Sequence, residues 1–146
     1  LMELEYDVDK LLNDIQQKDV KSIEEIEEIN KEVVDIVYSN FIKYKDNNDN
    51  KKECLNKIKT KMYEYVDSID DLTPNDTISS LDMNEFFNLK FKFLGFFVKK
   101  QEANKILIKS YTTKFWVLDK EKHILFRKLT SKDKVNMMLV DTINNL

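Results

Sequence analysis

The stretch FLGFFVKKQEANKILIKSYTTKFWVLDKEKHILFRKL, residues 93–129, decides the fold of this chain. It holds the chain's only glycine, tryptophan, histidine and arginine, which are Gly95, Trp116, His123 and Arg127. The β-prone runs KILIKSY, KFWVL and HILFRKL follow one another along it, and the polar runs KKQEAN and DKEK interrupt them. Strand-forming runs at this spacing predict an antiparallel β-meander.

The first half of the chain has the periodicity of helices instead. Apolar residues recur every three or four positions in three segments between residues 4 and 69, which predicts two or three helices. The last of these helices is expected over residues 51–70, and its heptad seam indicates antiparallel packing on the preceding helix. The seam consists of Leu55, Ile58, Met62, Tyr65 and Ile69.

The tail of the chain, residues 131–146, fits two structures. Thr130 and Asp133 have the spacing of residues that cap a helix, whereas the run VNMMLVDT also fits a short strand. If the tail is a helix, its apolar residues are expected to face inward. These are Val135, Met138, Leu139 and Ile143.

These patterns predict an α+β protein with two regions of opposite charge. The helical region, residues 1–72, is followed by a linker loop, residues 73–85, and by a basic β-meander module, residues 86–146, that ends in a helix or a strand. Residues 1–85 carry 11 Lys and 22 Asp or Glu, whereas residues 86–146 carry 13 Lys or Arg and 5 Asp or Glu. Such asymmetry indicates that the two regions bind different partners or attract each other.

The β-meander resembles the first strands of a pleckstrin-homology domain. The matching runs are GFFVKK from Gly95, KFWVL from Lys114 and ILFRK from Ile124, so the resemblance covers about residues 90–130. Domains of that family close a seven-stranded barrel with a carboxy-terminal helix, and only 18 residues follow Lys128 here. The resemblance therefore implies a partial domain of this kind, either because the chain is a fragment or because another chain completes the barrel; the alternative is an ordinary β-meander packed on helices.

The resemblance also implies an electropositive cup that binds phosphoinositide headgroups. Lysines near the first strands could hold phosphate oxygens as point charges. Trp116 stands where the tightest binders of the family have a basic residue, which favours general recognition of an anionic surface at about 1 kcal/mol per basic residue. The predicted anion-binding residues are Lys99, Lys100, Lys105 and Lys114.

Residues 71–82, DLTPNDTISSLD, resemble the calcium loop of an EF-hand. Polar residues fall at ligand positions of that loop, but Asp76 stands where glycine makes the sharp turn and Asp82 where a glutamate closes the shell. Because both departures weaken calcium binding, we predict no metal site and a capped loop between helices. The residues at ligand positions are Asp71, Thr73, Asn75 and Thr77.

No catalytic motif is present in the sequence, and we predict a protein that is not an enzyme and has no cofactor. His123 has no second histidine with which to form a metal pair, and Cys54 has the helical position of a small buried apolar residue. The sequence has no Gly-rich phosphate loop, serine elbow or paired-carboxylate motif.

The expected function is that of an adaptor. Its acidic helices would contact a protein partner or a second copy, and its basic sheet would contact anionic lipid headgroups or an acidic partner. The alternatives are a structural subunit whose basic sheet is covered internally or by a partner, and a nucleic-acid-binding protein whose aromatic residues stack on bases. A lone cysteine and the lack of a long apolar run favour a cytoplasmic protein without a transmembrane segment, with peripheral membrane association as an extension.

Overall fold

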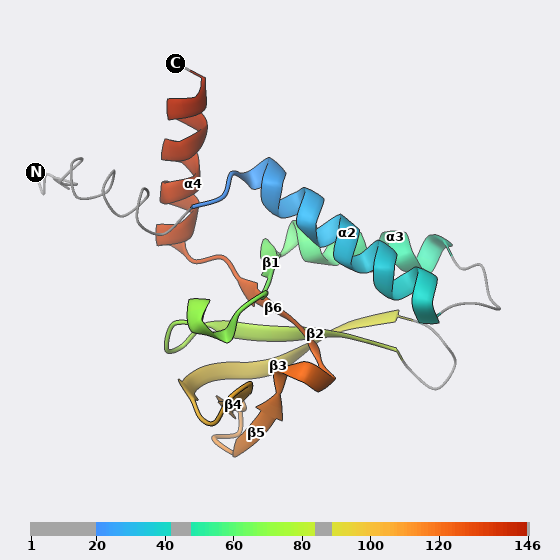
Figure 1. Ribbon diagram of the computed structural model, residues 1–146, viewed down its shortest axis with the longest axis vertical. Coiled ribbons are helices and arrows are strands. Elements are labelled where there is room, and N and C mark those ends of the chain that lie inside the picture. The colour runs from blue at the N-terminus through green and yellow to red at the C-terminus, as the bar shows by residue number, and fades with distance from the viewer. Residues whose placement is uncertain (1–19, 42–47, 84–88, 146) are drawn as a thin grey trace, which may run out of the picture.

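The computed structural model describes residues 20–41, 48–83 and 89–145 (Figure 1). Within these ranges, two helices precede a six-stranded antiparallel sheet and another helix follows it, which confirms the α+β class. The helices are α2 (Ile23–Phe41), α3 (Asn48–Thr60) and α4 (Ser131–Asn144). The strands are β1 (Tyr63–Tyr65), β2 (Thr77–Met83), β3 (Leu89–Lys100), β4 (Lys105–Lys109), β5 (Phe115–Asp119) and β6 (Ile124–Lys128), with short 3-10 helices η1 (Ile69–Asp71) and η2 (Lys120–Lys122).

The sheet curls into a partly open barrel. Its strand order is β1-β6-β2-β3-β4-β5, so β5 and β6 are neighbours in the chain but are separated in the sheet by β2, β3 and β4. Residues 120–123 alone connect them, and four residues span at most about 14 Å. The sheet must therefore bend until the ends of β5 and β6 approach each other, and Leu118 of β5 packs in the same buried cluster as Leu125 of β6.

Strand β3 makes this curl possible because it belongs to both halves of the barrel. Its first part pairs with β2 and its last part with β4, and the register shifts between Phe97 and Lys99 against β4. Gly95 lies at the bend. A Cβ atom there would contact the Ile108 side chain and approach the Lys109 carbonyl oxygen to 2.6 Å, so only glycine lets β3 and β4 pack this closely.

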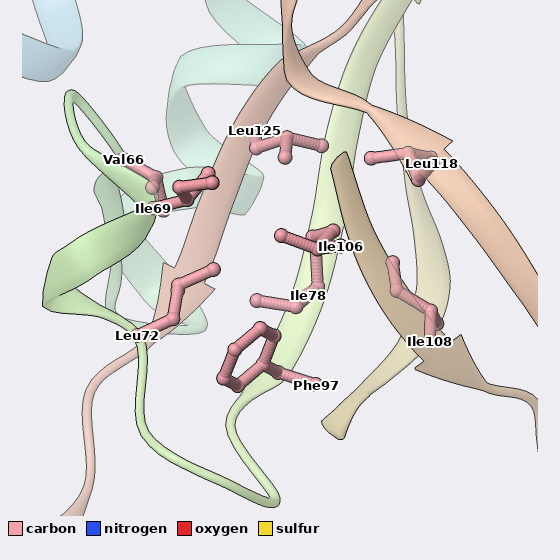
Figure 2. Close-up of a cluster of buried hydrophobic side chains, with 9 residues drawn as sticks. All are labelled: Val66, Ile69, Leu72, Ile78, Phe97, Ile106, Ile108, Leu118 and Leu125. Atoms are coloured by element: carbon pink, nitrogen blue, oxygen red, sulfur yellow. The ribbon is translucent and has the colours of Figure 1, made fainter. Parts of the chain in front are cut away.

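The interior of the barrel is apolar. Figure 2 shows side chains from β2, β3, β4, β5 and β6 meeting in one cluster, with residues 66–72 sealing the open side. Ile78, Ile106 and Ile108 in this cluster are completely buried. The cluster consists of Val66, Ile69, Leu72, Ile78, Phe97, Ile106, Ile108, Leu118 and Leu125.

Helices α2 and α3 cover the opposite face of the sheet. Leu125 of β6 points into the barrel, whereas its neighbour Phe126 points towards the helices, and both are completely buried. Successive strand residues face opposite sides, so β6 is buried on both faces. The cluster under the helices consists of Val34, Val37, Cys54, Ile58, Tyr63, Leu81, Leu89 and Phe126.

The tail forms helix α4, which resolves the choice between helix and strand. Thr130 and Asp133 make a reciprocal capping box, as their spacing predicts. The predicted inward face was wrong for Met138 and Ile143, which are exposed, whereas Val135 and Leu139 are half-buried. Met137 packs on Ile26 and Leu129 instead. The helix stands out from the rest of the molecule (Figure 1).

The structure corrects the predicted third helix, which ends at Thr60 rather than near residue 70. Met62 has a positive φ of 56°, which no helix continues. The seam residues beyond it belong to other elements, because Tyr65 lies in the edge strand β1 and Ile69 in η1. The apolar spacing simply continues past the end of the helix.

Residues 77–83 form strand β2, although we expected them to lie in a linker loop. The run TISSLDM is too polar to be recognised as a strand. Its serines are nevertheless buried, and Ser79 Oγ donates a hydrogen bond of 3.0 Å to Tyr63 Oη. Because β2 lies between β6 and β3, the expected linker is at the centre of the sheet.

Candidate binding surface

Strand β5 carries a patch of exposed apolar side chains. Phe115 is 59% exposed, Trp116 36% and Val117 49%, and Tyr111 in the preceding turn is 76% exposed. The other large apolar residues that are exposed in the described part of the chain, Ile36 among them, lie apart from this patch on α2 and α4. Phe115 and Val117 point to one side of β5 and Trp116 to the other, and several exposed apolar residues on one strand of a chain with 35% charged residues are typical of a binding surface.

Strand β5 is also an edge strand with a free side. It pairs only with β4 in the described sheet. Backbone hydrogen bonds at either end, from Ser110 N to Lys114 O and from Lys120 N to Asn104 O, fix which residues of β5 point towards β4. Because these directions alternate along an antiparallel strand, the peptide groups of Phe115, Val117 and Asp119 point away from β4.

The outer face of β3, β4 and β5 combines lysines with apolar side chains. Ile106 and Ile108 point into the barrel, so the alternate residues of β4 point outward. Cross-strand partners share a face, and the pairings Lys99–Leu107–Val117 and Lys109–Phe115 therefore bring lysines and exposed apolar residues together. We name this surface the lysine face; it consists of Lys99, Lys105, Leu107, Lys109, Phe115 and Val117.

Lys109 is a member of this surface that sequence reasoning missed. Its Nζ lies 6.0 Å from the centroid of the Phe115 ring, in the range of a cation–π contact. The strict alternation of KILIK around two buried isoleucines could have identified it, because that pattern puts both terminal lysines on one face of β4.

The four predicted anion-binding lysines do not form one cup. Lys99, Lys100 and Lys105 lie at the β3–β4 turn, whereas Lys114 lies in the β4–β5 turn at the opposite end of β4. Lys100 is paired with Asp70, at 2.8 Å between Nζ and Oδ1. Among the described residues, no carboxylate oxygen lies within 4.0 Å of the Nζ atom in Lys99, Lys105, Lys109 or Lys114.

A polar cleft of about 290 Å³ opens at the end of the barrel between η1, the β3–β4 turn and η2. Its charges are largely matched, because Lys100 pairs with Asp70 and Asn104 Nδ2 donates a hydrogen bond of 2.8 Å to Glu121 Oε1. Lys120 lies over the ring of Tyr65, 5.6 Å from its centroid. These contacts hold the turns together and gather no nucleophile with a base.

Arg127 is at the centre of a half-buried charge cluster. Its Nε contacts Glu64 Oε1 at 2.5 Å, and its Nη1 lies 2.9 Å from Asp133 Oδ2 and 3.8 Å from Asp76 Oδ1. The cluster therefore joins β6 to β1, to the loop before β2 and to the first turn of α4. With only 12% of its side chain exposed, Arg127 is a structural tie rather than a contact for a ligand.

Burial and hydrogen bonding shift the pKa values of the carboxylates in this cluster in different directions. Burial raises the pKa of Glu64 and of Asp76. The Arg127 charge offsets this only in part at Glu64, as do the hydrogen bond from the Thr73 backbone and the Arg127 charge at Asp76. Burial also acts to raise the pKa of Asp133, but hydrogen bonds from Arg127 and from the Thr130 backbone outweigh it, so that pKa lies below its ordinary value. The three carboxylates hold the pKa of Arg127 above its ordinary value despite its burial.

Residues 71–82 do not form a loop between helices. Asp71 ends η1, whereas Thr77 and Asp82 lie in the extended strand β2. Asp76 is buried, and its carboxylate accepts a hydrogen bond of 2.8 Å from the backbone of Thr73. Within the described ranges, no group of three or more His, Cys, Asp or Glu side chains is arranged to hold a metal ion.

Cys54 is buried under the helices, where its Sγ lies 3.4 Å from the Leu89 carbonyl oxygen. Burial raises the pKa of this thiol, which keeps it protonated and unreactive at neutral pH. His123 follows η2 as its C-cap, and its side chain is only partly buried. In the described part of the chain, neither Cys54 nor His123 contacts a second side chain with which it could form a catalytic pair.

Comparisons with known proteins identify no relative of this chain. A scan against models of protein families finds no match, and searches of curated proteins and of solved structures find none either. The resemblance to a pleckstrin-homology domain therefore stays a prediction. No helix among the described residues is sufficiently long and apolar to cross a membrane.

Proposed function

We propose that this chain is a non-enzymatic binding module whose lysine face binds an acidic protein partner. The observation that carries the proposal is the arrangement of Lys99, Lys105 and Lys109, which lie beside the exposed side chains of Phe115 and Val117 and form no ion pair within 4.0 Å among the described residues, although Asp119 is the cross-strand partner of Lys105. Lysines left unpaired around an apolar patch attract a partner of opposite charge, while the patch supplies contact area.

A protein partner suits this surface better than a lipid bilayer does. The exposed apolar residues lie on an edge strand whose peptide groups at Phe115 and Val117 have no partner strand in the part of the chain that the structure describes. Water or another polypeptide can satisfy those groups, but hydrocarbon cannot, and each unsatisfied group in hydrocarbon costs several kcal/mol. Contact with anionic headgroups alone would leave the aromatic side chains unused.

Nucleic acid is the weaker alternative. The aromatic rings of Phe93, Phe96 and Tyr111 pack on one another, with centroids 4.6 to 5.6 Å apart, and so are less available for stacking on bases. The only arginine, Arg127, is held by three carboxylates away from the surface.

The helices carry less of the proposed binding than the sequence suggests. Helices α2 and α3 bury their apolar residues against the sheet, and Ile36 is the large apolar residue that α2 leaves exposed in the described segment. We therefore assign protein binding to the sheet rather than to the helical region. A cytoplasmic location is retained as part of this proposal.

The test compares three anionic probes with the native protein over a salt series. The probes are poly-L-glutamate, vesicles of phosphatidylcholine with phosphatidylserine, and single-stranded DNA. Poly-L-glutamate is expected to have the highest affinity of the three probes when they are compared at equal concentration of negative charge. Binding should weaken with salt, because such charges are screened over about 10 Å at 0.1 M.

Changing Lys99, Lys105, Lys109 and Lys114 together to Glu should abolish this binding. In a matched variant, four other exposed lysines are changed to Glu: Lys52, Lys59, Lys61 and Lys132. This variant has the same change in net charge and should retain most of the affinity. Tighter binding of vesicles or of DNA would transfer the proposal to that ligand. Binding of none of the probes would favour a structural subunit, a role that the pairing of Lys100 with Asp70 already suits.

A further inference from the structure

We infer that the free edge of β5 accepts an extended acidic segment of a partner as an additional antiparallel strand of the sheet. This inference rests on the proposed function and specifies how the partner binds. In strand addition, main-chain hydrogen bonds hold the segment while alternate side chains select it. The available main-chain groups are those of Phe115, Val117 and Asp119, which point away from β4.

At two other places, the fold covers open peptide groups of the sheet with an asparagine side chain. At the opposite edge of the sheet, Asn30 of α2 donates from Nδ2 to Tyr63 O at 2.9 Å and accepts from Tyr65 N at 3.0 Å. Asn50 of α3 likewise donates from Nδ2 to Leu89 O at 2.9 Å and accepts at Oδ1 from Leu89 N at 2.7 Å. A side-chain amide thus takes the place of a neighbouring strand at both positions.

Strand β5 has no such cover among the described residues. Edge strands are usually protected by proline, by charge, by a bulge or by an overlying element. The β5 run FWVLD contains no proline, it pairs with β4 without a bulge, and its central residues are aromatic or β-branched. An edge of this composition is suited to pairing with another strand.

The charges around β5 identify the chemistry of the segment. Lys114 precedes the strand and Lys109 lies on the adjacent strand, so the start of β5 is basic, whereas at its end Asp119 and Glu121 alternate with Lys120 and Lys122. The centre of the strand presents Phe115 and Val117 on its outer face. The complementary segment is therefore extended, with apolar residues in its centre and acidic residues at the end that lies beside Lys109 and Lys114.

A second copy of this chain fits the edge less well. Two copies of β5 paired antiparallel about Val117 would oppose Lys114 of each copy to Lys120 of the other, and like charges directly opposite each other destabilise a sheet. An acidic residue in the partner segment would instead attract Lys114.

The probe is an acetylated and amidated nine-residue peptide of sequence EDVTVTVDE. This sequence reads the same in both directions, so both strand orientations offer the same side chains. The native protein should bind the peptide, and the variant with Lys99, Lys105, Lys109 and Lys114 changed to Glu should not. The peptide KKVTVTVKK, with lysines in place of the acidic residues, is the charge control and should not bind the native protein.

Two N-methylated forms of the probe test the strand geometry. One form carries methyl groups on the valine nitrogens and the other on the threonine nitrogens, so each form blocks one edge of the added strand. One form should lose affinity by about tenfold or more while the other binds as the unmodified peptide does. Equal affinities of the two forms would overturn strand addition.

The variant Val117→Pro removes an N–H group from the free edge without removing a hydrogen bond to β4. It should melt as the native protein does yet bind the peptide about tenfold or more weakly, whereas Val117→Thr, which keeps the N–H group, should bind. If Val117→Pro fails to fold, the N-methylated peptides still decide the question. Native affinity in a folded Val117→Pro variant would overturn the inference.

The outcomes separate this inference from the proposed function. If the acidic peptide binds through the four lysines but both N-methylated forms bind equally, the lysine face remains and strand addition fails. If neither the acidic peptide nor poly-L-glutamate binds at low salt, both proposals fail. A dimer of the native protein that Val117→Pro abolishes would make a second copy the occupant and overturn the acidic segment.

Discussion

Gly95 lies where β3 passes from its pairing with β2 to its pairing with β4, and a side chain there would collide with Ile108 and with the Lys109 carbonyl. We expect Gly95→Ala to lower the free energy of unfolding by about 1–3 kcal/mol, because an overpacked site forces the strands apart. Urea denaturation measures this. Lys92→Ala, at an exposed position of the same strand, is the control and should cost about 1 kcal/mol or less.

Asp133 links the start of α4 to Arg127, and its pKa lies below the ordinary value of 3.8. A lowered folded-state pKa adds stability that is present above the unfolded pKa and is lost as the pH falls through the folded pKa. Asp133→Asn should therefore reduce the free energy of unfolding by about 1–3 kcal/mol at pH 7. The difference from the native protein should shrink as the pH falls below 3.8.

Denaturation at pH 7, 5 and 3 checks this expectation. Glu64 and Asp76 act in the opposite direction, because burial raises their pKa values and they take up protons more readily in the folded protein. Their contribution to stability should therefore increase on acidification, and the Asp133 charge adds to the rise of both pKa values. An unchanged free energy of unfolding in Asp133→Asn at pH 7 would contradict the role of Asp133.

At the scale of single residues, sequence patterns could not predict how the lysines are arranged. Lys99 and Lys105 do lie on one surface, since a short turn joins their strands. Lys114 lies at the other end of β4, because the length of β4 separates the two turns. The distance between two turns depends on strand register, which no local pattern in the sequence specifies.

At the scale of elements, Asn30 connects α2 to the edge strand β1. Asn30→Ala would leave Tyr63 O and Tyr65 N without partners beneath the helix, which should lower the free energy of unfolding by about 1–3 kcal/mol for each group. Hydrogen exchange of the Tyr65 amide should accelerate with it. Asn56→Ala, at an exposed site on α3, is the control, and an unchanged Tyr65 exchange rate in Asn30→Ala would contradict the capping role.

Elements with a strong local signal were predicted and those with a tertiary origin were not. The capping box at Thr130 and Asp133 starts α4 as expected, because its hydrogen bonds are local. Strand β1 was missed, because it has only three residues and exists through its pairing with β6 and its contacts with Asn30. Strand β2 was also missed, because its serines make it look like a polar loop in the sequence, and only the folded structure shows that they are buried.

At the scale of the whole molecule, the predicted division into a helical region and a β-meander module does not match the way the sheet is built. Strand β1 comes from residues 1–72 and β2 from residues 73–85, yet β6 pairs with both. The residues of β6 alternate between the barrel interior and the cluster under the helices, so the two clusters share one strand. The α+β class was predictable from periodicity, whereas this interleaving depends on long-range pairing.

We therefore expect a fragment of residues 86–146 to remain unfolded. It lacks β2, so β3 and β6 have no strand between them and the interior of the barrel stays open to water. Circular dichroism should show no cooperative thermal transition for the fragment, in contrast to the full chain. Coexpression with residues 1–85 should restore the transition, and a cooperative transition of the fragment alone would contradict the interleaved sheet.

The position of Trp116 has a consequence for how this molecule can be observed. The chain has no other tryptophan, and this one is 36% exposed on the edge strand β5. Intrinsic fluorescence excited at the indole band therefore comes from that edge. An added strand that covers the indole should shift its emission to shorter wavelengths and shield it from iodide quenching. The protein thus carries a built-in optical probe for occupancy of its free edge, and no label is needed.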